Sequence, residues 1–388
     1  MRYRYSTGKD GKPEKKALVY THDEHGIDVG NVDGEAMGVI QRLKDMGYET
    51  YIVGGAVRDL ILGKKPKDFD IVSAASPVQI RKIFRNSRII GRRFKLVHVY
   101  FGPRIYEVST FRSLRDGLTG NTFGTIEEDV LRRDFTMNAL FYDPGQQIVV
   151  DYVGGMRDIR AKRVKAIIPL ATIFKDDPVR MIRAVKYAAA TGFALPLSLK
   201  WKIKAQSPLL STVSPSRLTE EIFKIINSPH AGGIVEALDG LGLYAYLQPD
   251  AARLMRANAG FRGRYLRSLS ALHGEGFKNR PGETLGALIN DYMEDTTDPE
   301  LGTSENYKAT YAAARNFVLP MNPPRFELEQ AVRRFFSSRG IHIRKSQFAE
   351  RAGGAKGPAK EDTGPPGETK PRRRRPKRKT KGKVRPSP

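Results

Sequence analysis

The hydrophobic pattern of this chain changes near Asp176, and that change limits the folds that are open to it. Before this point, short apolar runs of strand length alternate with amphipathic segments at helical spacing. After it, residues 176–192, 214–228 and 232–247 carry apolar residues at helical spacing, with Gly and Pro between them. A chain of 388 residues, 40% of them hydrophobic, is long enough to bury two or three cores. We therefore expect a mixed α/β (α+β) domain followed by all-α domains.

An antiparallel hairpin is the clearest feature of the first part. Its two runs, 94–101 and 104–111, flank a Gly-Pro turn. A hairpin argues against an all-parallel nucleotide-binding sheet. Further elements are expected as helices over 33–49 and 76–86 and as short strands over 50–55 and 68–73.

Composition narrows the functional classes. The chain has no cysteine, which excludes disulfides, thiolate nucleophiles and cysteine zinc sites, and which predicts a reducing cytoplasm. His22 and His25 lack the i, i+4 spacing of a helical zinc pair. The first residues have no apolar signal-peptide core, and the longest apolar stretch, 166–174, is about half a membrane span. We expect no transmembrane segment.

The charge of the chain predicts a polyanionic partner. Net charge is +25, from 67 Lys and Arg against 42 Asp and Glu. Residues 370–388 carry 11 Lys and Arg and no acidic residue, which leaves +14 on the rest of the chain. Nucleic acid suits such a surplus better than an anionic membrane surface. From about Ala352 the apolar residues disappear, so we expect 352–388 to be a disordered basic tail.

Two aspartates separated by one residue follow a glycine pair in "YIVGGAVRDLILGKKPKDFDIVS" (51–73). In a strand, Asp68 and Asp70 share a face, and two carboxylates this close need a cation, for which Mg²⁺ with a nucleoside triphosphate is suited. For this pair alone, a solvated strand edge is the preferred interpretation. Glu107 in "RIYEVSTFR" is a third carboxylate. It either faces solvent or, on a neighbouring strand, completes a two-metal site for phosphoryl transfer.

The glycine pair offers a place for phosphate. Gly54 and Gly55 end a strand and open a helix, and Arg58 lies one turn inside it. The lysine and hydroxyl residue of a P-loop are missing. An ordinary turn would use the same glycines.

Two later segments carry polar residues of the same kind. "RRDFTMNAL" (132–140) contains Arg133, Asp134 and Asn138. If it is helical, Asp134 and Asn138 are i, i+4 neighbours that present one face to a ribose and phosphates. The alternative is a capping aspartate followed by an amphipathic helix.

The segment "KDDPVRMIRAVKYAA" (175–189) begins with Asp177 before Pro178, which is typical of an N-cap and first-turn pair. Arg180 lies three residues further on, near the same face. A guanidinium beside a carboxylate can recognise the edge of a base. Capping and base recognition are compatible.

Together, "GGAVRDLILGKKPKDFDIV", "EVSTFR", "RRDFTMNAL" and "DDPVRMIRAVKYAA" resemble the motifs of the class II nucleotidyltransferases, the bacterial poly(A) polymerases and CCA-adding enzymes. The resemblance extends over about His22 to Pro249. "IIGRRFKLVHV" (89–99) is similar to the poly(A) polymerase branch. The chain departs from the family at Asp176, where a glutamate is usual, and in a short loop after Arg112.

This resemblance implies a polymerase-β-like nucleotidyltransferase head with a helical neck and body. The expected ranges are an N-terminal arm over 1–32, a head over 33–170, a neck over 171–235, a body over 236–351 and a tail over 352–388. In this family Asp68 and Asp70 would bind Mg²⁺, or Mn²⁺, with Glu107 in the third catalytic position. The remaining roles follow by motif, with the triphosphate held by Gly54, Gly55, Arg58 and Arg133, the ribose and phosphates by Asp134 and Asn138, and the base by Asp177 and Arg180.

The implied reaction is attack of an RNA 3′-hydroxyl on the α-phosphate of ATP, with release of pyrophosphate. The expected partners are RNA 3′ ends, ATP and RNA-decay proteins. A tRNA CCA-adding enzyme shares every catalytic motif and stays the first alternative. A non-catalytic RNA-binding protein stays the second.

Overall fold

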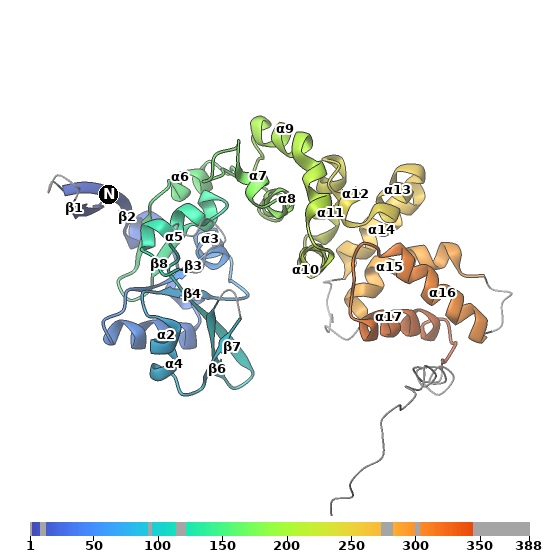
Figure 1. Ribbon diagram of the computed structural model, residues 1–388, viewed down its shortest axis with the longest axis horizontal. Helices are drawn as coiled ribbons and strands as arrows, with labels where there is room; N and C mark the ends of the chain where they lie inside the picture. Colours follow the sequence, from blue (N-terminus) through green and yellow to red (C-terminus); the bar gives the residue numbers. More distant parts are fainter. Residues whose placement is uncertain are drawn as a thin grey trace, which may run out of the picture. The chain divides into compact units, whose positions relative to one another are not determined.

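The computed structural model describes residues 2–7, 13–91, 95–113, 122–272, 282–298 and 303–343 (Figure 1). Residues Met1–Ile343 form one compact unit by their contacts. The predicted tail, 352–388, lies outside the described residues, as do 92–94 within the 89–99 motif. Because the larger unit is not divided further, the boundaries of head, neck and body stay predictions.

A nine-stranded mixed sheet forms the first half of the chain, in the order β1-β2-β9-β8-β3-β4-β7-β6-β5. Its pairs are antiparallel except β4 with β7, which run parallel. The predicted hairpin is confirmed as β6 and β7. The strands are β1 (Arg2–Thr7), β2 (Pro13–Tyr20), β3 (Thr50–Val53), β4 (Asp70–Ser73), β5 (Ser87–Ile90), β6 (Leu96–Phe101), β7 (Arg104–Thr110), β8 (Leu140–Asp143) and β9 (Ile148–Asp151).

The N-terminal residues are not the extended arm expected over 1–32. Strands β1 and β2 pair with each other, and β2 continues the sheet by pairing with β9 through Leu18 and Asp151. Ala17 is buried in the core of the sheet. The sequence did not indicate these strands, because strands at the edge of a sheet are rich in charged residues and therefore resemble a polar loop.

Short helices pack on this sheet. Helix α5 (Ile126–Arg132) places Ile126 and Val130 in one core with Val53 of β3 and Val72 of β4. Helix α4 begins with the predicted Ser76 cap, whose hydroxyl and Gln79 form a reciprocal capping box. The other helices of this part are α1 (His22–His25), η1 (Val29–Asn31), α2 (Gly34–Asp45), α3 (Gly55–Ile61), α4 (Pro77–Ile83), η2 (Thr136–Asn138) and α6 (Gly155–Arg160).

Beyond residue 170, the described residues contain helices and no further strand, as the sequence predicted. None of the described helices is long and apolar enough to cross a membrane. They are α7 (Ile173–Asp176), α8 (Val179–Thr191), α9 (Leu197–Gln206), η3 (Ser207–Thr212), α10 (Pro215–Ile226), α11 (Ala231–Gly240), α12 (Tyr244–Leu247), α13 (Pro249–Ala257), α14 (Ala259–Ala271), α15 (Glu283–Thr296), α16 (Thr303–Phe317) and α17 (Arg325–Ser337).

Helix α8 contacts the mixed domain near its middle and just beyond its C-terminal end. Near its middle, the Tyr187 ring meets the Phe135 ring edge-on, with centroids 6.0 Å apart. Just beyond its C-terminus, Ala194 exchanges backbone hydrogen bonds with Lys162 and Val164. These contacts fix α8 against the segments that follow α5 and α6.

Two adjacent glycines of α11 test how closely this helix packs on α14. A Cβ at Gly232 would lie 2.6 Å from the Leu266 carbonyl oxygen, a backbone atom that cannot rotate away, whereas a Cβ at Gly233 meets nothing within 4 Å. We expect Gly232→Ala to destabilise the protein by about 1–3 kcal/mol through overpacking. The matched control Gly233→Ala should be neutral, or stabilising by up to about 1 kcal/mol. Urea unfolding followed by circular dichroism measures both, and equal effects would contradict the close packing.

Candidate active site

Three carboxylates meet where β4 and β7 lie side by side. The parallel register pairs Ile71 with Val108, so Asp70 at the start of β4 lies beside Glu107. Asp70 shares a face with Val72, on the side of the sheet that α5 covers. Asp68 precedes β4 rather than belonging to it. Glu107 therefore lies beside Asp70, and its side chain is also 54% exposed to solvent. Its place in a two-metal site stays a prediction.

The two aspartates differ from Glu107 in their contacts. Within the described ranges, neither Asp68 nor Asp70 accepts a hydrogen bond or forms an ion pair, while Glu107 lies 3.4 Å from Nε2 of His98. Burial raises the pKa of Asp70, even though its side chain keeps contact with solvent. The negative charges of Glu107 and Asp68 raise this pKa further, whereas the positive charge of Arg133 lowers it. The site is therefore short of positive charge. In the described part of the chain, no group of three or more His, Cys, Asp or Glu side chains is arranged so that it could hold a metal ion.

Gly54 brings a turn of backbone close to Asp70. Its φ of +76° and ψ of −139° lie in a region that residues with a side chain rarely adopt. A Cβ at this position would lie 3.5 Å from Oδ2 of Asp70. Gly55 then begins α3, and Arg58 follows one turn later.

Asn138 holds two arginines in place, one through its side chain and one through its backbone. Arg58 donates from Nη1 to Oδ1 of Asn138 at 3.0 Å, and Arg133 donates from Nη1 to the Asn138 carbonyl oxygen at 3.2 Å. Each guanidinium also has a carboxylate partner, Asp59 for Arg58 and Asp129 for Arg133. Two cations 75 residues apart in the sequence are thus fixed around one residue, and Arg133 is close enough to Asp70 to lower its pKa.

Asp134 and Asn138 are not the helical neighbours that the sequence suggested. Helix α5 ends at Arg132, and Arg133 and Phe135 have extended backbone angles. This segment is extended rather than helical, because Phe135 is fully buried and forms an antiparallel bridge with Ala166. Asn138 ends the 3-10 helix η2, so it reaches the site from a turn.

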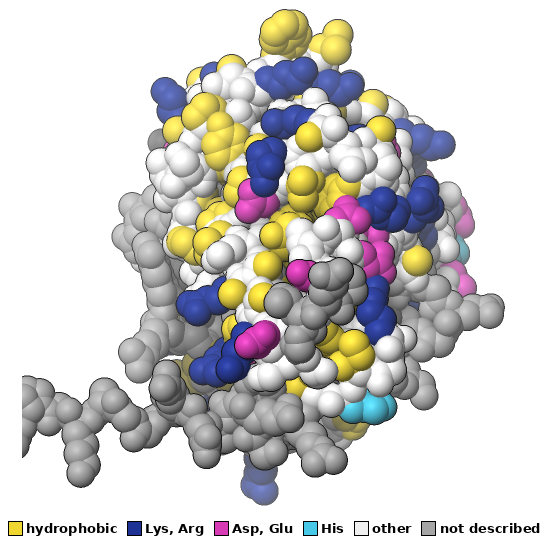
Figure 2. Space-filling model, turned by 90° about the vertical axis from the view of Figure 1, so that its right-hand side faces the viewer, with side chains coloured by type: hydrophobic (Ala, Val, Ile, Leu, Met, Phe, Trp, Pro, Cys, Tyr) yellow, Lys and Arg dark blue, Asp and Glu magenta, His cyan; other side chains and the backbone are white. Residues whose placement is uncertain are grey.

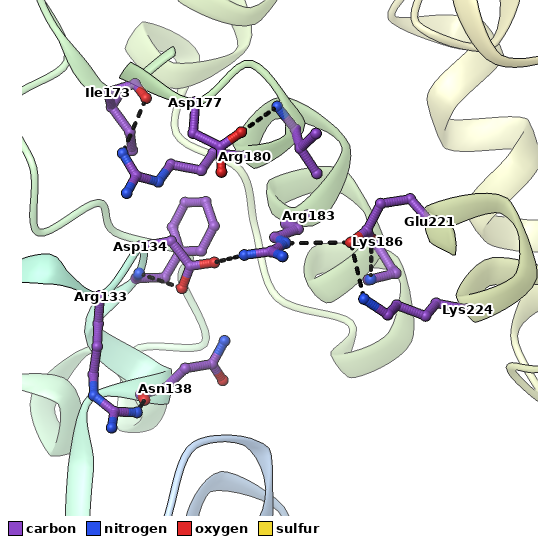
Figure 3. A network of polar contacts seen from close by, with 12 residues as sticks. Arg133, Asp134, Asn138, Ile173, Asp177, Arg180, Arg183, Lys186, Glu221 and Lys224 are labelled. Atoms are coloured by element: carbon purple, nitrogen blue, oxygen red, sulfur yellow. Dashed lines mark hydrogen bonds and ion pairs between the residues drawn. The ribbon is translucent and has the colours of Figure 1, made fainter. Parts of the chain in front are cut away.

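A line of charges leads from Asp134 into the helices (Figure 3). The Asp134 carboxylate lies 3.8 Å from Nη1 of Arg183 on α8, and Nε of Arg183 donates to Glu221 on α10 at 3.5 Å. Glu221 also accepts from Lys186 at 2.7 Å and from Lys224 at 3.3 Å. Burial raises the pKa of Asp134, whereas Arg183 opposes this shift.

Asp177 and Arg180 lie nearby but do not bond to each other. Oδ1 of Asp177 accepts the Val179 N–H at 3.2 Å, which is the expected capping contact, and both its oxygens accept from Arg217 at 3.0 Å. Arg180 is buried and donates from Nη1 to the Ile173 carbonyl at 3.3 Å. Burial lowers the pKa of Arg180.

No role was predicted for Arg183, Lys186 or Glu221, although the first two lie within the 175–189 motif and all three connect α8 with α10. Arg183 could have been noticed, since it repeats Arg180 at i+3 on one helical face. Glu221 gave no such signal, because a glutamate in an amphipathic helix is expected to face solvent and this one is buried. Arg112 was also missed, and it lines a hollow beside Arg133.

Comparison with known proteins agrees with this arrangement. Residues 50–165 match the poly A polymerase head domain, and residues 192–255 match a family described as a probable RNA and SrmB-binding site of polymerase A. The chain is 41% identical over 259 residues to poly(A) polymerase I of Escherichia coli O6:H1, which covers 63% of this chain and 56% of that relative. The chain therefore contains the poly A polymerase head domain, and over 63% of its length it is similar to a poly(A) polymerase.

Other proteins are also similar to the chain. A CCA-adding enzyme of Geobacillus kaustophilus is 36% identical over 240 residues, covering 60% of this chain and 59% of the relative. The crystal structure of the Bacillus stearothermophilus CCA-adding enzyme in complex with CTP shares the fold with a TM-score of 0.53 and 29% identity, over 79% of this chain and 82% of that one. The chain spans 56% to 59% of the length of the curated relatives described here.

Glu221 provides a test of the charged network. Burial opposes its ionisation, but Lys186, Lys224 and Arg183 outweigh burial and hold its pKa below the usual value. Glu221→Gln leaves the buried Lys186 without a countercharge and should destabilise the protein by about 3–5 kcal/mol at neutral pH. Because the folded pKa is lowered, this contribution is present at higher pH and is lost as the pH falls below about 4.

Denaturant unfolding from pH 7 down to pH 3.5 measures the difference in the free energy of unfolding between Glu221→Gln and the wild type. The exposed neighbour Glu220 is the matched control, and Glu220→Gln should change stability little at any pH. A Glu221→Gln protein as stable as the wild type at pH 7 would show that the network contributes nothing.

Proposed function

We propose that this protein is a template-independent poly(A) polymerase that adds AMP from ATP to RNA 3′ ends and releases pyrophosphate. The observation that supports this most concerns Asp68 and Asp70, which bond to no residue that the structure describes and lie beside two fixed guanidiniums. The aspartates need positive charge and the guanidiniums beside them supply it to an anion, so the site suits a cation bound together with a triphosphate. Similarity to poly(A) polymerases supports the same chemistry.

The aspartates fit a divalent metal ion. They have no protein partner within the described residues, and the surrounding carboxylates disfavour a second negative charge at Asp70. Mg²⁺ commonly takes only one or two carboxylates and completes its shell with water and substrate phosphates. Two aspartates, with Glu107 close by, are therefore sufficient. When bound, Mg²⁺ or Mn²⁺ would lower the pKa of the attacking hydroxyl and neutralise charge on the phosphates.

Arg58 and Arg133 are the proposed triphosphate ligands. Their positions are fixed by Asn138, so little side-chain entropy would be lost when phosphate binds. Gly54 and Gly55 let the backbone approach the same place. Asp134 and Asn138 would lie along the ribose and phosphates, with Asp134 kept in position by Arg183.

Asp177 and Arg180 are the proposed contacts to the base. Asp177 now bonds Arg217, and Arg180 bonds the Ile173 carbonyl. When a base binds, Asp177 and Arg180 would exchange these partners for the donor and acceptor groups on the edge of the base.

In the reaction, the 3′-hydroxyl oxygen bonds to the α-phosphorus, the bond from the α-phosphorus to the bridging oxygen breaks, and pyrophosphate leaves.

Poly(A) addition is preferred over CCA addition because the poly(A) polymerase relatives are 41% identical and the CCA-adding relative 36%. A cytoplasmic location, a role in RNA processing and decay, and contact with RNA-decay proteins belong to the same proposal. The basic tail would add sequence-independent affinity for phosphate.

Primer extension with the full chain tests the proposal. With Mg²⁺ and ATP, an arbitrary RNA 3′ end should receive a long tail. Asp70→Asn removes one charge from the cation site and should lower the rate at least about 100-fold. The control Asp45→Asn, at the exposed end of α2, where Oδ1 of Asp45 accepts a hydrogen bond from Gln41, should extend RNA at the wild-type rate.

A different product would contradict the assignment. Three nucleotides added only to tRNA lacking its terminal CCA, with CTP required, would identify a CCA-adding enzyme. No incorporation with any nucleotide, together with retained RNA binding, would favour the non-catalytic RNA-binding protein.

A further inference from the structure

Strands β1 and β2 form a hairpin at one edge of the nine-stranded sheet. Neither of the two ranges that match a family, 50–165 and 192–255, includes this hairpin. Strand β1 is the first in the order of the sheet, so no other strand of the described residues lies on its outer side (Figure 1). The hairpin can therefore be reached from outside the sheet.

One face of the hairpin carries exposed tyrosines. Tyr5 is 58% exposed and Tyr3 is 38% exposed, and residues two apart in a strand point to the same face. Tyr3 lies opposite Leu18, and Tyr5 lies opposite Lys15. Because directly opposite residues of an antiparallel pair also share a face, these four side chains form one surface, which we call the hairpin face.

A tyrosine holds a cation over the hairpin face. Nζ of Lys15 lies 3.3 Å from the centroid of the Tyr3 ring, which is a cation–π contact. The rings of Tyr3 and Tyr5 meet edge to face, with centroids 6.3 Å apart. Lys15 therefore covers the Tyr3 ring, and the more exposed Tyr5 ring has a positive charge fixed beside it.

A second cation borders the same face toward β9. Tyr20 follows Leu18 by two residues in β2, so the two share a face. Cζ of the exposed Arg160, on α6, lies 5.5 Å from the centroid of the Tyr20 ring. Nη2 of Arg160 also donates to the Glu24 carbonyl oxygen at 2.7 Å, which fixes the guanidinium. At about 3.3 Å per residue, Lys15 and Tyr20 lie roughly 16 Å apart along β2. The hairpin face therefore has a fixed cation at each end.

The charge of the hairpin favours an anionic ligand. Residues 2–20 contain six Lys and Arg and two acidic residues. Glu14 already accepts from Lys16 at 2.6 Å, and Asp151, opposite Leu18, is buried and accepts backbone N–H groups at the start of α6. On the face of the molecule that Figure 2 shows, Lys and Arg side chains are interspersed with acidic and hydrophobic ones. The hairpin face is distinguished by cations that aromatic rings hold in place.

We propose that the hairpin face binds single-stranded RNA, with a base stacked on the Tyr5 ring, one phosphate at Lys15 and a phosphate further along the strand at Arg160. The proposal rests on the proposed function, because it adds a contact to the same substrate. Aromatic rings beside cations hold single strands without sequence preference, since every base has a face that can stack. An acidic protein segment would satisfy the cations but would leave the Tyr5 ring without a flat partner.

Cross-linking locates this contact on the full wild-type chain. Twelve-nucleotide oligo(A) probes, each with 5-iodouridine at one position, are bound without ATP and irradiated, because iodouracil couples to an aromatic ring on which it stacks. Trypsin cleaves after Arg4 and Lys9, so residues 5–9 form one peptide in which Tyr5 is the single aromatic residue. We expect mass spectrometry to find RNA attached to this peptide. RNA attached to other peptides only would overturn the proposal.

Variants separate stacking from charge, with affinity measured by the anisotropy of fluorescein-labelled oligo(A). Tyr5→Leu should weaken binding roughly 5- to 150-fold, the effect of one lost base stack, whereas Tyr5→Phe keeps the ring and should bind as the wild type does. Lys15→Gln should reduce the slope of log Kd against log salt by about 0.7. The matched control is Arg2→Gln, which should leave that slope unchanged, because Arg2 lies on β1 next to Tyr3 and points to the other face.

Unchanged affinity of Tyr5→Leu, with an unfolding temperature equal to that of the wild type, would also overturn the proposal and leave the hairpin face to an acidic protein segment. Primer extension is measured separately. A chain that extends RNA with ATP but is not cross-linked at Tyr5 would keep the proposed function and lose the hairpin site. A chain that is cross-linked at Tyr5 but extends no RNA would contradict the proposed function while supporting the hairpin site.

Discussion

The parallel register of β4 with β7 is the constraint on which the candidate site depends. It sets Asp70 beside Glu107, with Asp68 two residues away, and none of the described cations forms an ion pair with the two aspartates. Like charges this close are unfavourable unless a cation lies between them. The nearby arginines do not neutralise the aspartates, because Asp59, Asp129 and Asn138 already hold them. The structure thus keeps the aspartates and the arginines apart from each other. A triphosphate bound to a metal ion would contact both, through the metal at the aspartates and through its phosphates at the arginines.

Helix α8 connects this site to the rest of the helices. Arg183 and Tyr187 contact the segment that follows α5, and Arg183 and Lys186 share Glu221 with α10. Burial lowers the pKa of Lys186 and Glu221 opposes this shift, while Lys186, Lys224 and Arg183 hold the pKa of Glu221 below its usual value. The network fixes how α8 sits against α10, because removal of either partner would leave the other charge without its counterion in a largely buried place.

Local signals explain what the sequence predicted. Strand alternation identified the β6–β7 hairpin, and Ser76 identified the start of α4. Interactions between distant residues were not predictable. Nothing in the polar N-terminus indicated that β2 would pair with β9, and nothing near Asn138 indicated its bond to Arg58, 80 residues away. The helical alternative for the segment through Asp134 was wrong, because Phe135 is buried with extended backbone angles instead.

Binding of Mn²⁺ by the chain tests the central claim most directly, namely that the aspartates beside β7 require a divalent cation. Free Mn²⁺ can be followed by electron paramagnetic resonance during titration of the wild type, Asp68→Asn and Asp70→Asn, each with ATP and without RNA. We expect one or two bound ions per wild-type chain and clearly weaker binding in both variants. Equal Mn²⁺ binding by all three proteins would show that the ions are held elsewhere and would contradict the account.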